Sequence, residues 1–290
     1  MIKRYHTFLP NLKESWLLVL LLVVGGGIGG SIVAVVATLI FPELISWNTV
    51  IAYPLMFIPP FFYIALRVYN TRGTLSVPFH NPDYGKVGAP LFFILLLILV
   101  ISAGVAIDPL TDILEMPDYM KKFLDTLSDN KLTGFITLAV FAPILEEFFC
   151  RGIILRGLLS VMKPWKAILW SALIFGVIHL NPWQAIPAFL IGLLLGWIYY
   201  KSRSLWAVIF MHFVNNGTAF LMLVFFPALP QDFSLRDIFT GNSYYYLYFL
   251  ALILLTLIIY VIKKGHDKAL PDQIRPNYQR ESLGRDQTGN

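Results

Sequence analysis

Long apolar segments separated by short polar links form the main pattern along this chain. A segment of about 18 or more apolar residues predicts a membrane-spanning helix, because a helix satisfies its own backbone hydrogen bonds where water is absent. Eight such segments can be recognised, at residues 16–42, 48–67, 88–108, 132–159, 165–182, 184–200, 204–226 and 243–263. The pattern therefore predicts an all-α polytopic integral membrane protein with about eight transmembrane helices.

Two regions fall outside these segments. Residues 109–130 mix apolar side chains with several acids and two lysines, a composition typical of an amphipathic helix that lies on the outer membrane surface. Residues 265–290 are polar and include prolines and glycines, which favours a disordered tail. The chain then divides into N-terminal helices with the outer interfacial helix (1–130), a central core (131–217), C-terminal helices (218–264) and the tail (265–290).

Composition supports a membrane protein. Of the 290 residues, 57% are hydrophobic and 13% are charged, whereas a soluble chain carries roughly 25% charged residues. This excludes both a water-soluble globular fold and a wholly disordered chain. The single cysteine, Cys150, excludes a disulfide framework and a cysteine-rich zinc module, and we expect it to be a small packed residue.

The net charge of +5 reflects how basic residues are distributed between the links. Lysines and arginines precede the first segment, separate the second from the third, and follow the fourth, sixth and eighth, whereas acids dominate residues 109–130. By the positive-inside rule both termini are expected in the cytoplasm, in a cell membrane that we expect to be a bacterial inner membrane. The basic excess marks topology, so the expected partners are membrane lipid and a membrane-associated peptide or protein, and not nucleic acid.

A glycine motif in the first segment needs a separate interpretation. Gly25, Gly27 and Gly30 satisfy the spacing G-x-G-x-x-G, but a dinucleotide site requires a preceding strand and a βαβ unit. Small residues spaced by four, such as Gly25 with Gly29 and Gly26 with Gly30, instead favour close packing between membrane helices.

Strongly polar residues inside the predicted spans are few. Each costs on the order of 2.5–3.5 kcal/mol by insertion scales, so each is a functional hypothesis. They are confined to the fourth, fifth and seventh spans and comprise Glu146, Glu147, Arg151, His179, His212, Asn215 and Asn216.

The spacing of these residues predicts which of them share a helix face. Glu147 and Arg151 are four residues apart, the separation at which an ion pair closes on a helix, while Glu146 points about 100° away. His212 and Asn216 are also four residues apart. All three spans enter from the same side, so these groups are expected to meet near mid-membrane, with His179 lying deeper.

A carboxylate, two imidazoles and a carboxamide form a set suited to activating water. A carboxylate shielded from bulk water is a better general base, and a histidine can share the proton or orient the water. Imidazole and amide groups can also donate hydrogen bonds to a developing oxyanion. The structural alternative is that the same residues only bridge helices through hydrogen bonds and a buried ion pair.

Three motifs in order resemble those of the CPBP intramembrane proteases, the family that includes CaaX prenyl endopeptidases and bacterial Abi proteins. Glu146-Glu147-Phe148-Phe149-Cys150-Arg151 is similar to E-E-x-x-x-R, Phe175-Gly176-Val177-Ile178-His179 to F-x-x-x-H, and His212-Phe213-Val214-Asn215-Asn216 to H-x-x-x-N. The resemblance covers residues from about 132 to 217.

The resemblance implies a role for each residue. Glu146 would activate water with help from His179, and His212 with Asn216 would form the oxyanion hole. Glu147 and Arg151 would support the first motif. Some family members are described as metalloproteases, and Glu146, His179 and His212 could offer zinc a site of two histidines and one carboxylate. We favour no cofactor, because the sequence identifies no outer partner for the histidines.

The resulting hypothesis is an intramembrane endopeptidase that cleaves a prenylated, leader-type or other membrane-associated peptide at a cavity opening to the cytoplasm or the inner leaflet. The alternative is a non-enzymatic transporter or bacteriocin-immunity protein that acts by binding, because polar groups on facing helices also mark transport pathways. Against transport, the chain contains no recognisable repeat pair.

Overall fold

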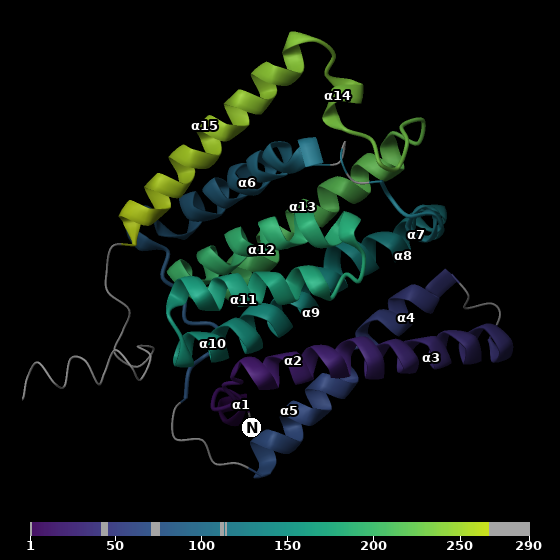
Figure 1. The fold of residues 1–290 in the computed structure, drawn as a ribbon, viewed down its shortest axis with the longest axis vertical. Helices are drawn as coiled ribbons and strands as arrows, with labels where there is room; N and C mark the ends of the chain where they lie inside the picture. Colours follow the sequence, from purple (N-terminus) through teal and green to yellow (C-terminus); the bar gives the residue numbers. More distant parts are fainter. Residues whose placement is uncertain (1, 42–45, 71–75, 111–112, 114, 267–290) are drawn as a thin grey trace, which may run out of the picture.

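The computed structural model describes residues 2–41, 46–70, 76–110, 113 and 115–266; the tail predicted to be disordered lies almost entirely outside them. The described residues form helices and no strands, which confirms the all-α prediction (Figure 1). The N-terminal helices are α1 (Ile2–Tyr5), α2 (Leu12–Leu20), α3 (Gly27–Ile40), α4 (Asn48–Leu55), α5 (Ile58–Asn70), α6 (Gly88–Ile107) and α7 (Asp118–Asp129). The later helices are α8 (Lys131–Phe135), α9 (Ala142–Glu147), α10 (Arg156–Val161), α11 (Pro164–Val177), α12 (Pro182–Ser202), α13 (Leu205–Phe225), α14 (Leu235–Ile238) and α15 (Asn242–Gly265).

Among the described residues, six helical segments are long and apolar enough to cross a membrane, as expected of a polytopic membrane protein. They are Leu12–Ile40, Asn48–Asn70, Gly85–Leu110, Pro182–Ser202, Leu205–Phe225 and Asn242–Gly265. The other two predicted spans also form helices: α11 has 14 residues, fewer than the approximately 20 that a straight span requires, and the fourth predicted span is a continuous helical path.

That path carries three of the candidate residues, Glu146, Glu147 and Arg151. It comprises α8, the π-helical segment η5 (Ile136–Phe141), α9, the π-helical segment η6 (Phe148–Leu155) and α10. Pro143, in the first turn of α9, has no N–H, and its ring pushes away the preceding turn of backbone. Wider π turns commonly absorb such disturbances at functional sites. Glu146 and Glu147 thus lie on one short α-helical turn between two π-helical segments.

The two ends of the molecule differ in charge, although the end with more acids also carries Lys121, Lys122 and Arg236. Figure 1 shows α1, α10 and the end of α15 at one end, and α7 and α14 at the other. We call the first the basic end, defined by Arg4, Lys13, Lys163, Lys201 and Lys263, and the second the acidic end, defined by Asp108, Asp118, Asp125, Asp232 and Asp237.

Hydrogen bonds fasten the links at each end. At the basic end the backbone N–H of Asp83 donates to the carbonyl of Ser202 at 2.7 Å. At the acidic end Asp108 accepts from the backbone N–H of Leu235 at 2.8 Å and from the hydroxyl of Ser234 at 3.1 Å. The loops are therefore held against the helix bundle at both ends.

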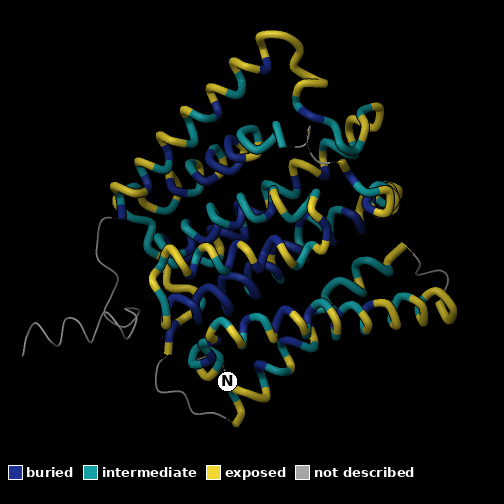
Figure 2. Tube along the Cα trace, viewed as in Figure 1, coloured by how far each residue is buried: buried dark blue, intermediate teal, exposed yellow. Residues whose placement is uncertain are grey.

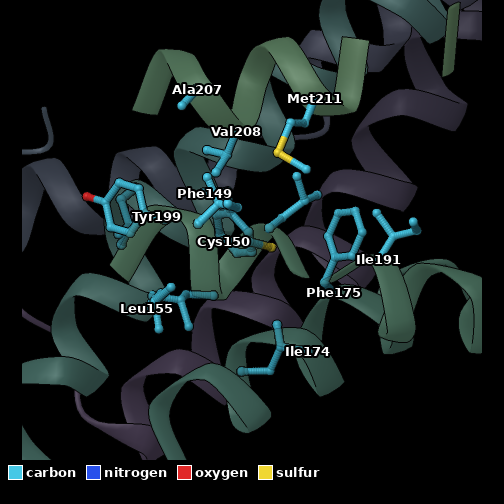
Figure 3. Close-up of a cluster of buried hydrophobic side chains, with 14 of the residues drawn as sticks. Phe149, Cys150, Leu155, Ile174, Phe175, Ile191, Tyr199, Ala207, Val208 and Met211 are labelled. Atoms are coloured by element: carbon cyan, nitrogen blue, oxygen red, sulfur yellow. The ribbon is translucent and has the colours of Figure 1, made fainter. Parts of the chain in front are cut away.

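The buried core lies in the central helices. Figure 2 shows buried residues concentrated on α9 to α13 and exposed residues along α3 and α15, as expected for helices that face lipid. Figure 3 shows part of this core, with Cys150 among aliphatic and aromatic side chains. Cys150 is fully buried, as predicted for a packed residue.

Candidate active site

The first carboxylate of interest, Glu147, is fully buried and binds two partners. Its Oε1 atom accepts a hydrogen bond from the Arg151 guanidinium at 2.7 Å and from Nδ1 of His212 at 2.9 Å. The ion pair predicted from the four-residue spacing is therefore present. Glu147 also joins α9 to α13, which the sequence did not predict.

Arg151 extends this network to two further helices. Its guanidinium donates to the backbone carbonyl of Gly192 on α12 at 3.0 Å and lies over the ring of Phe175 on α11, 4.4 Å from the ring centroid. Such stacking is attractive because the ring face carries negative charge. A single buried cation thus connects the central helical path, α11 and α12.

Glu146 lies one residue earlier and has different surroundings. Its Oε1 atom accepts a hydrogen bond from the hydroxyl of Tyr53 on α4. Its Oε2 atom lies 4.0 Å from Nε2 of His212, beyond direct hydrogen-bonding distance but within reach of a bridging water. The two neighbouring carboxylates therefore face opposite nitrogens of one imidazole, and only Glu147 is hydrogen-bonded to it.

His179 lies just beyond the end of α11, where the backbone turns sharply. Its Nδ1 atom donates to the carbonyl of Phe175 at 2.7 Å, so in the neutral ring Nε2 is an acceptor. The next residue, Leu180, adopts a positive φ of 59°, a conformation that is strained for a non-glycine residue and is often found at functional sites. Asn181 then caps α12 and donates to the carbonyl of His179 at 2.9 Å.

Asn216 lies one turn beyond His212 on α13. Its side-chain N–H donates to the carbonyl of Leu138 at 3.0 Å, and its oxygen accepts from Asn215 at 3.1 Å. A carboxamide has two N–H donors, so a second one can serve another acceptor.

A cavity of about 930 Å³ connects several of these groups. Its described lining includes Tyr53, Glu146, His179 and Asn216, together with many apolar side chains. The cavity lies between the hairpin formed by α2 to α5, at residues 22–27 and 53–57, and a wall made by α7, α9, the turn after α11, the start of α12 and α13. Its volume is near the upper end of the range of about 300–1,000 Å³ for ligand pockets.

The structure thus separates the predicted residues into two layers. Glu146, His179 and Asn216 line the cavity, and Glu147, Arg151 and His212 form a buried network behind them. His212, predicted from the resemblance to share an oxyanion hole with Asn216, is only 4% exposed and is not among the described lining residues.

Phe175 joins the two layers. Its ring makes edge contacts with both His179 and His212, at centroid distances of 5.2 and 5.5 Å, and Arg151 covers its face. Figure 3 shows the ring reaching into the core beside Ile191. The aromatic residue of the second motif therefore contacts residues of all three motifs.

Tyr53 is a site residue that the sequence analysis did not identify. It lies next to Pro54 in α4, which forms the first part of the second span, and a tyrosine near a span end is ordinarily an interfacial anchor. The only local signal was a hydroxyl placed within an apolar segment. Its contact with Glu146 spans 93 positions of sequence, so helix periodicity could not reveal it.

The donor atoms do not fit a zinc ion. Among the residues that the structure describes, no group of three or more His, Cys, Asp or Glu side chains is placed to hold a metal. The structure does supply the outer partners that the sequence did not identify, because Nδ1 of His179 donates to the Phe175 carbonyl and Nδ1 of His212 to Glu147. Only the placement of the described side chains therefore speaks against zinc.

Comparisons with known proteins point to one family. Residues 128–218 match the family model described as type II CAAX prenyl endopeptidase Rce1-like. The chain is also 29% identical over 87 residues to a Bacillus subtilis (strain 168) protein named "Putative membrane peptidase YdiL", an alignment that covers 30% of this chain and 36% of the relative. The match therefore spans about a third of that relative's length. No solved structure matches the chain.

Proposed function

Because residues 128–218 belong to the CPBP family of intramembrane proteases, as the three motifs predicted, we propose that this protein is an intramembrane peptidase with Glu146 as its general base. One observation carries the proposal. Glu146 is a carboxylate only 8% exposed that nevertheless lines a large cavity, and the described lining of this cavity also includes His179 and Asn216. Shielding a carboxylate from water costs free energy, so a carboxylate inside a membrane span indicates a role in binding or catalysis.

The first chemical step is attack by water. Glu146 takes a proton from a water molecule in the cavity, and Nε2 of His179 accepts a hydrogen bond from the same water and orients it. The water oxygen bonds to the carbonyl carbon of the peptide, and the carbonyl electron pair moves onto oxygen. Tyr53 holds Oε1 of Glu146. The other oxygen, Oε2, is buried, faces His212 and has no hydrogen-bond partner among the described residues, so it is the atom we assign to take the proton.

The second step is collapse of the tetrahedral intermediate. The second N–H of Asn216 donates to the oxyanion, in surroundings where little water competes and each donor is therefore stronger. When the carbon–nitrogen bond breaks, Glu146 returns its proton to the departing amine. One water is consumed, and the products are a carboxylic acid and an amine.

The buried network positions this machinery. Glu147 fixes the ring of His212, whose other nitrogen faces Glu146, and Arg151 neutralises the charge of Glu147. We therefore assign His212, Glu147 and Arg151 to positioning of Glu146. This differs from the oxyanion role that the resemblance implies for His212, because His212 lies behind Glu146 rather than on the cavity wall.

The proposed reaction contains no metal or cofactor step, in line with the donor geometry. We expect peptidase activity to survive prolonged dialysis against a strong chelator and to be unchanged by added zinc. Loss of activity that zinc restores would contradict this part of the proposal.

The test compares membrane peptides from cells that express the wild-type protein or Glu146→Gln. Quantitative peptidomics should find fragments that disappear in Glu146→Gln, because the amide keeps the shape of the carboxylate and cannot accept the proton. The matched control is Glu115→Gln, the same change at an exposed position outside the helices, which should leave the fragments present.

Immunoblots must show equal amounts of all three proteins in the membrane. Identical peptide profiles for wild type and Glu146→Gln would contradict the peptidase. If a transport or immunity phenotype also persisted in Glu146→Gln, the function would be one of binding.

A further inference from the structure

We propose that the substrate reaches Glu146 from the acidic end of the molecule, which faces away from the cytoplasm, and that it is an internal apolar segment of a peptide rather than a free C-terminus. This inference rests on the proposed peptidase function and specifies its substrate. It also replaces the sequence-based expectation of a cavity open to the cytoplasm or the inner leaflet.

The cavity extends from the site toward the acidic end. Beyond Glu146 and His179 its described lining continues to Trp183 and Gln184 at the start of α12, to α7, and to the link 226–233 after α13. All of these segments lie at the end of the molecule opposite to α1 and to the C-terminal end of α15 (Figure 1). The walls that lead outward from the site therefore belong to the acidic end.

The opposite direction is blocked by the core. Continuing from Glu147 toward the basic end, the helical path carries Arg151, Ile154, Leu155 and Leu158, all fully buried. Arg156 then donates to the carbonyl of Phe8 at 2.7 Å. This hydrogen bond holds the N-terminal segment against the basic end of the helical path. A peptide arriving from the basic end would have to displace packed side chains.

The charge distribution assigns a side of the membrane to each end. Links rich in lysine and arginine remain in the cytoplasm, and acids have little influence on this preference. The basic end, with Lys163, Lys201 and Lys263 in links or last turns, is thus the cytoplasmic side. The cavity then opens on the extracytoplasmic side or into the outer leaflet.

The charges around the cavity select against a free carboxylate. Its described lining contains one cation, Lys121, and that side chain is paired with Asp232 at 3.1 Å. The other charged lining residues are Asp125 and Glu146. A substrate C-terminus would bring another negative charge into a partly desolvated site without an available partner, which is unfavourable.

The mouth of the cavity is amphipathic and connects two segments. Lys121 and Asp125 of α7 contact Asp232 and Gln231 of the link after α13. Next to these polar contacts the described lining is apolar, and includes Phe123, Leu124, Phe226, Leu229 and Phe233. An apolar, uncharged or basic segment matches this lining better than an acidic one.

Cysteine accessibility tests the direction of entry without requiring activity. Ala219→Cys places a thiol on the cavity wall, and Ser128→Cys places a second at the α7 side of the cavity. A membrane-impermeant maleimide should label both in intact cells from outside. Thr218→Cys, the exposed neighbour of Ala219 outside the described lining, is the matched control and should react poorly because it faces lipid.

Two further proteins calibrate the assay. Wild type, with only buried Cys150, is the blank, and Lys163→Cys at the basic end should be labelled only in inverted vesicles. Labelling after detergent solubilisation shows that each thiol is present and reactive. Labelling of Ala219→Cys and Ser128→Cys only in inverted vesicles, or from neither side, would overturn the proposed direction and leave the peptidase proposal standing.

The peptides that disappear in Glu146→Gln test the substrate class. They should derive from extracytoplasmic or outer-leaflet segments and be cut at internal apolar positions. Peptides cut within a few residues of a cytoplasmic C-terminus would overturn this part, whereas a complete lack of differences would instead contradict the peptidase function itself.

Discussion

His212 and Glu147 are joined by a hydrogen bond of 2.9 Å between two buried side chains that come from helices 65 residues apart in the sequence. A carboxylate can only accept, so Nδ1 of the ring carries the proton and Nε2 is directed toward Glu146. The same Glu147 oxygen accepts from Arg151. This single carboxylate therefore fixes both the ring orientation and the position of a buried cation.

Glu147→Gln should both destabilise the protein and abolish activity. Removing one partner of a buried ion pair costs about 3–5 kcal/mol, because the other charge is left uncompensated. Thermal unfolding in detergent should show the loss. The double variant Glu147→Leu with Arg151→Met should recover part of the stability, because no charge remains unpaired, yet stay inactive. A double variant as active as wild type would contradict the positioning role.

Tyr53→Phe should reduce turnover while leaving the fold intact. The change removes only the hydroxyl that donates to Glu146, and a hydrogen bond to a charged group contributes about 1.5–3 kcal/mol. If that energy is expressed in the transition state, the turnover number falls roughly 10- to 150-fold.

Peptidase assays on the purified protein would measure this effect. Tyr63→Phe, the same change in the neighbouring helix α5, is the matched control and should retain full turnover. Equal turnover of Tyr53→Phe and Tyr63→Phe would show that the contact with Glu146 has no role in the reaction.

The sequence predicted those parts of the site that local periodicity determines. Glu147 and Arg151 pair because they share one helix. Apolar length identified the six described segments that are long and apolar enough to cross a membrane, but it also predicted spans at 132–159 and 165–182, which are not among the six. The prediction that the glycines allow close helix packing is confirmed for Gly26. A Cβ added at Gly26 would lie 2.2 Å from the carbonyl oxygen of Met56.

Other features depend on contacts between distant segments and could not be read from periodicity. Tyr53 reaches Glu146 only after the N-terminal hairpin packs against the core. The expected depth of His179 assumed a continuous helix through residue 182, but α11 ends at Val177 and the chain turns at Leu180. His179 lines the same cavity as Glu146.

Arg156→Lys should lower stability with little direct effect on chemistry. The guanidinium donates to the backbone carbonyls of Tyr5, His6, Phe8, Val77 and Gly152. It also lies 4.2 Å from the ring centroid of Phe79. An ammonium group cannot reproduce this planar set of donors, so we expect a loss of about 3 kcal/mol.

Thermal unfolding, measured beside Arg203→Lys, would check the expected loss. Arg203 is partly exposed and its contact with Asp83 is 3.7 Å long, so its replacement should cost less than about 1 kcal/mol. Equal stability of the two variants would show that the buried guanidinium does not hold the N-terminal segment in place.

Gly26→Ala should separate the first two spans locally, and Gly29→Ala should not. A Cβ at Gly26 would approach the backbone of Met56 to 2.2 Å, whereas a Cβ at Gly29 would meet nothing within 4 Å. Overpacking of this kind costs about 1–3 kcal/mol, and alanine is the better helix former at Gly29.

Because Met56 and Tyr53 share the same hairpin, Gly26→Ala should also lower peptidase turnover by displacing Tyr53 from Glu146. Unfolding temperatures and turnover of both variants would test the two effects, and a Gly26→Ala protein as stable and active as Gly29→Ala would show that this close approach of helices is not required.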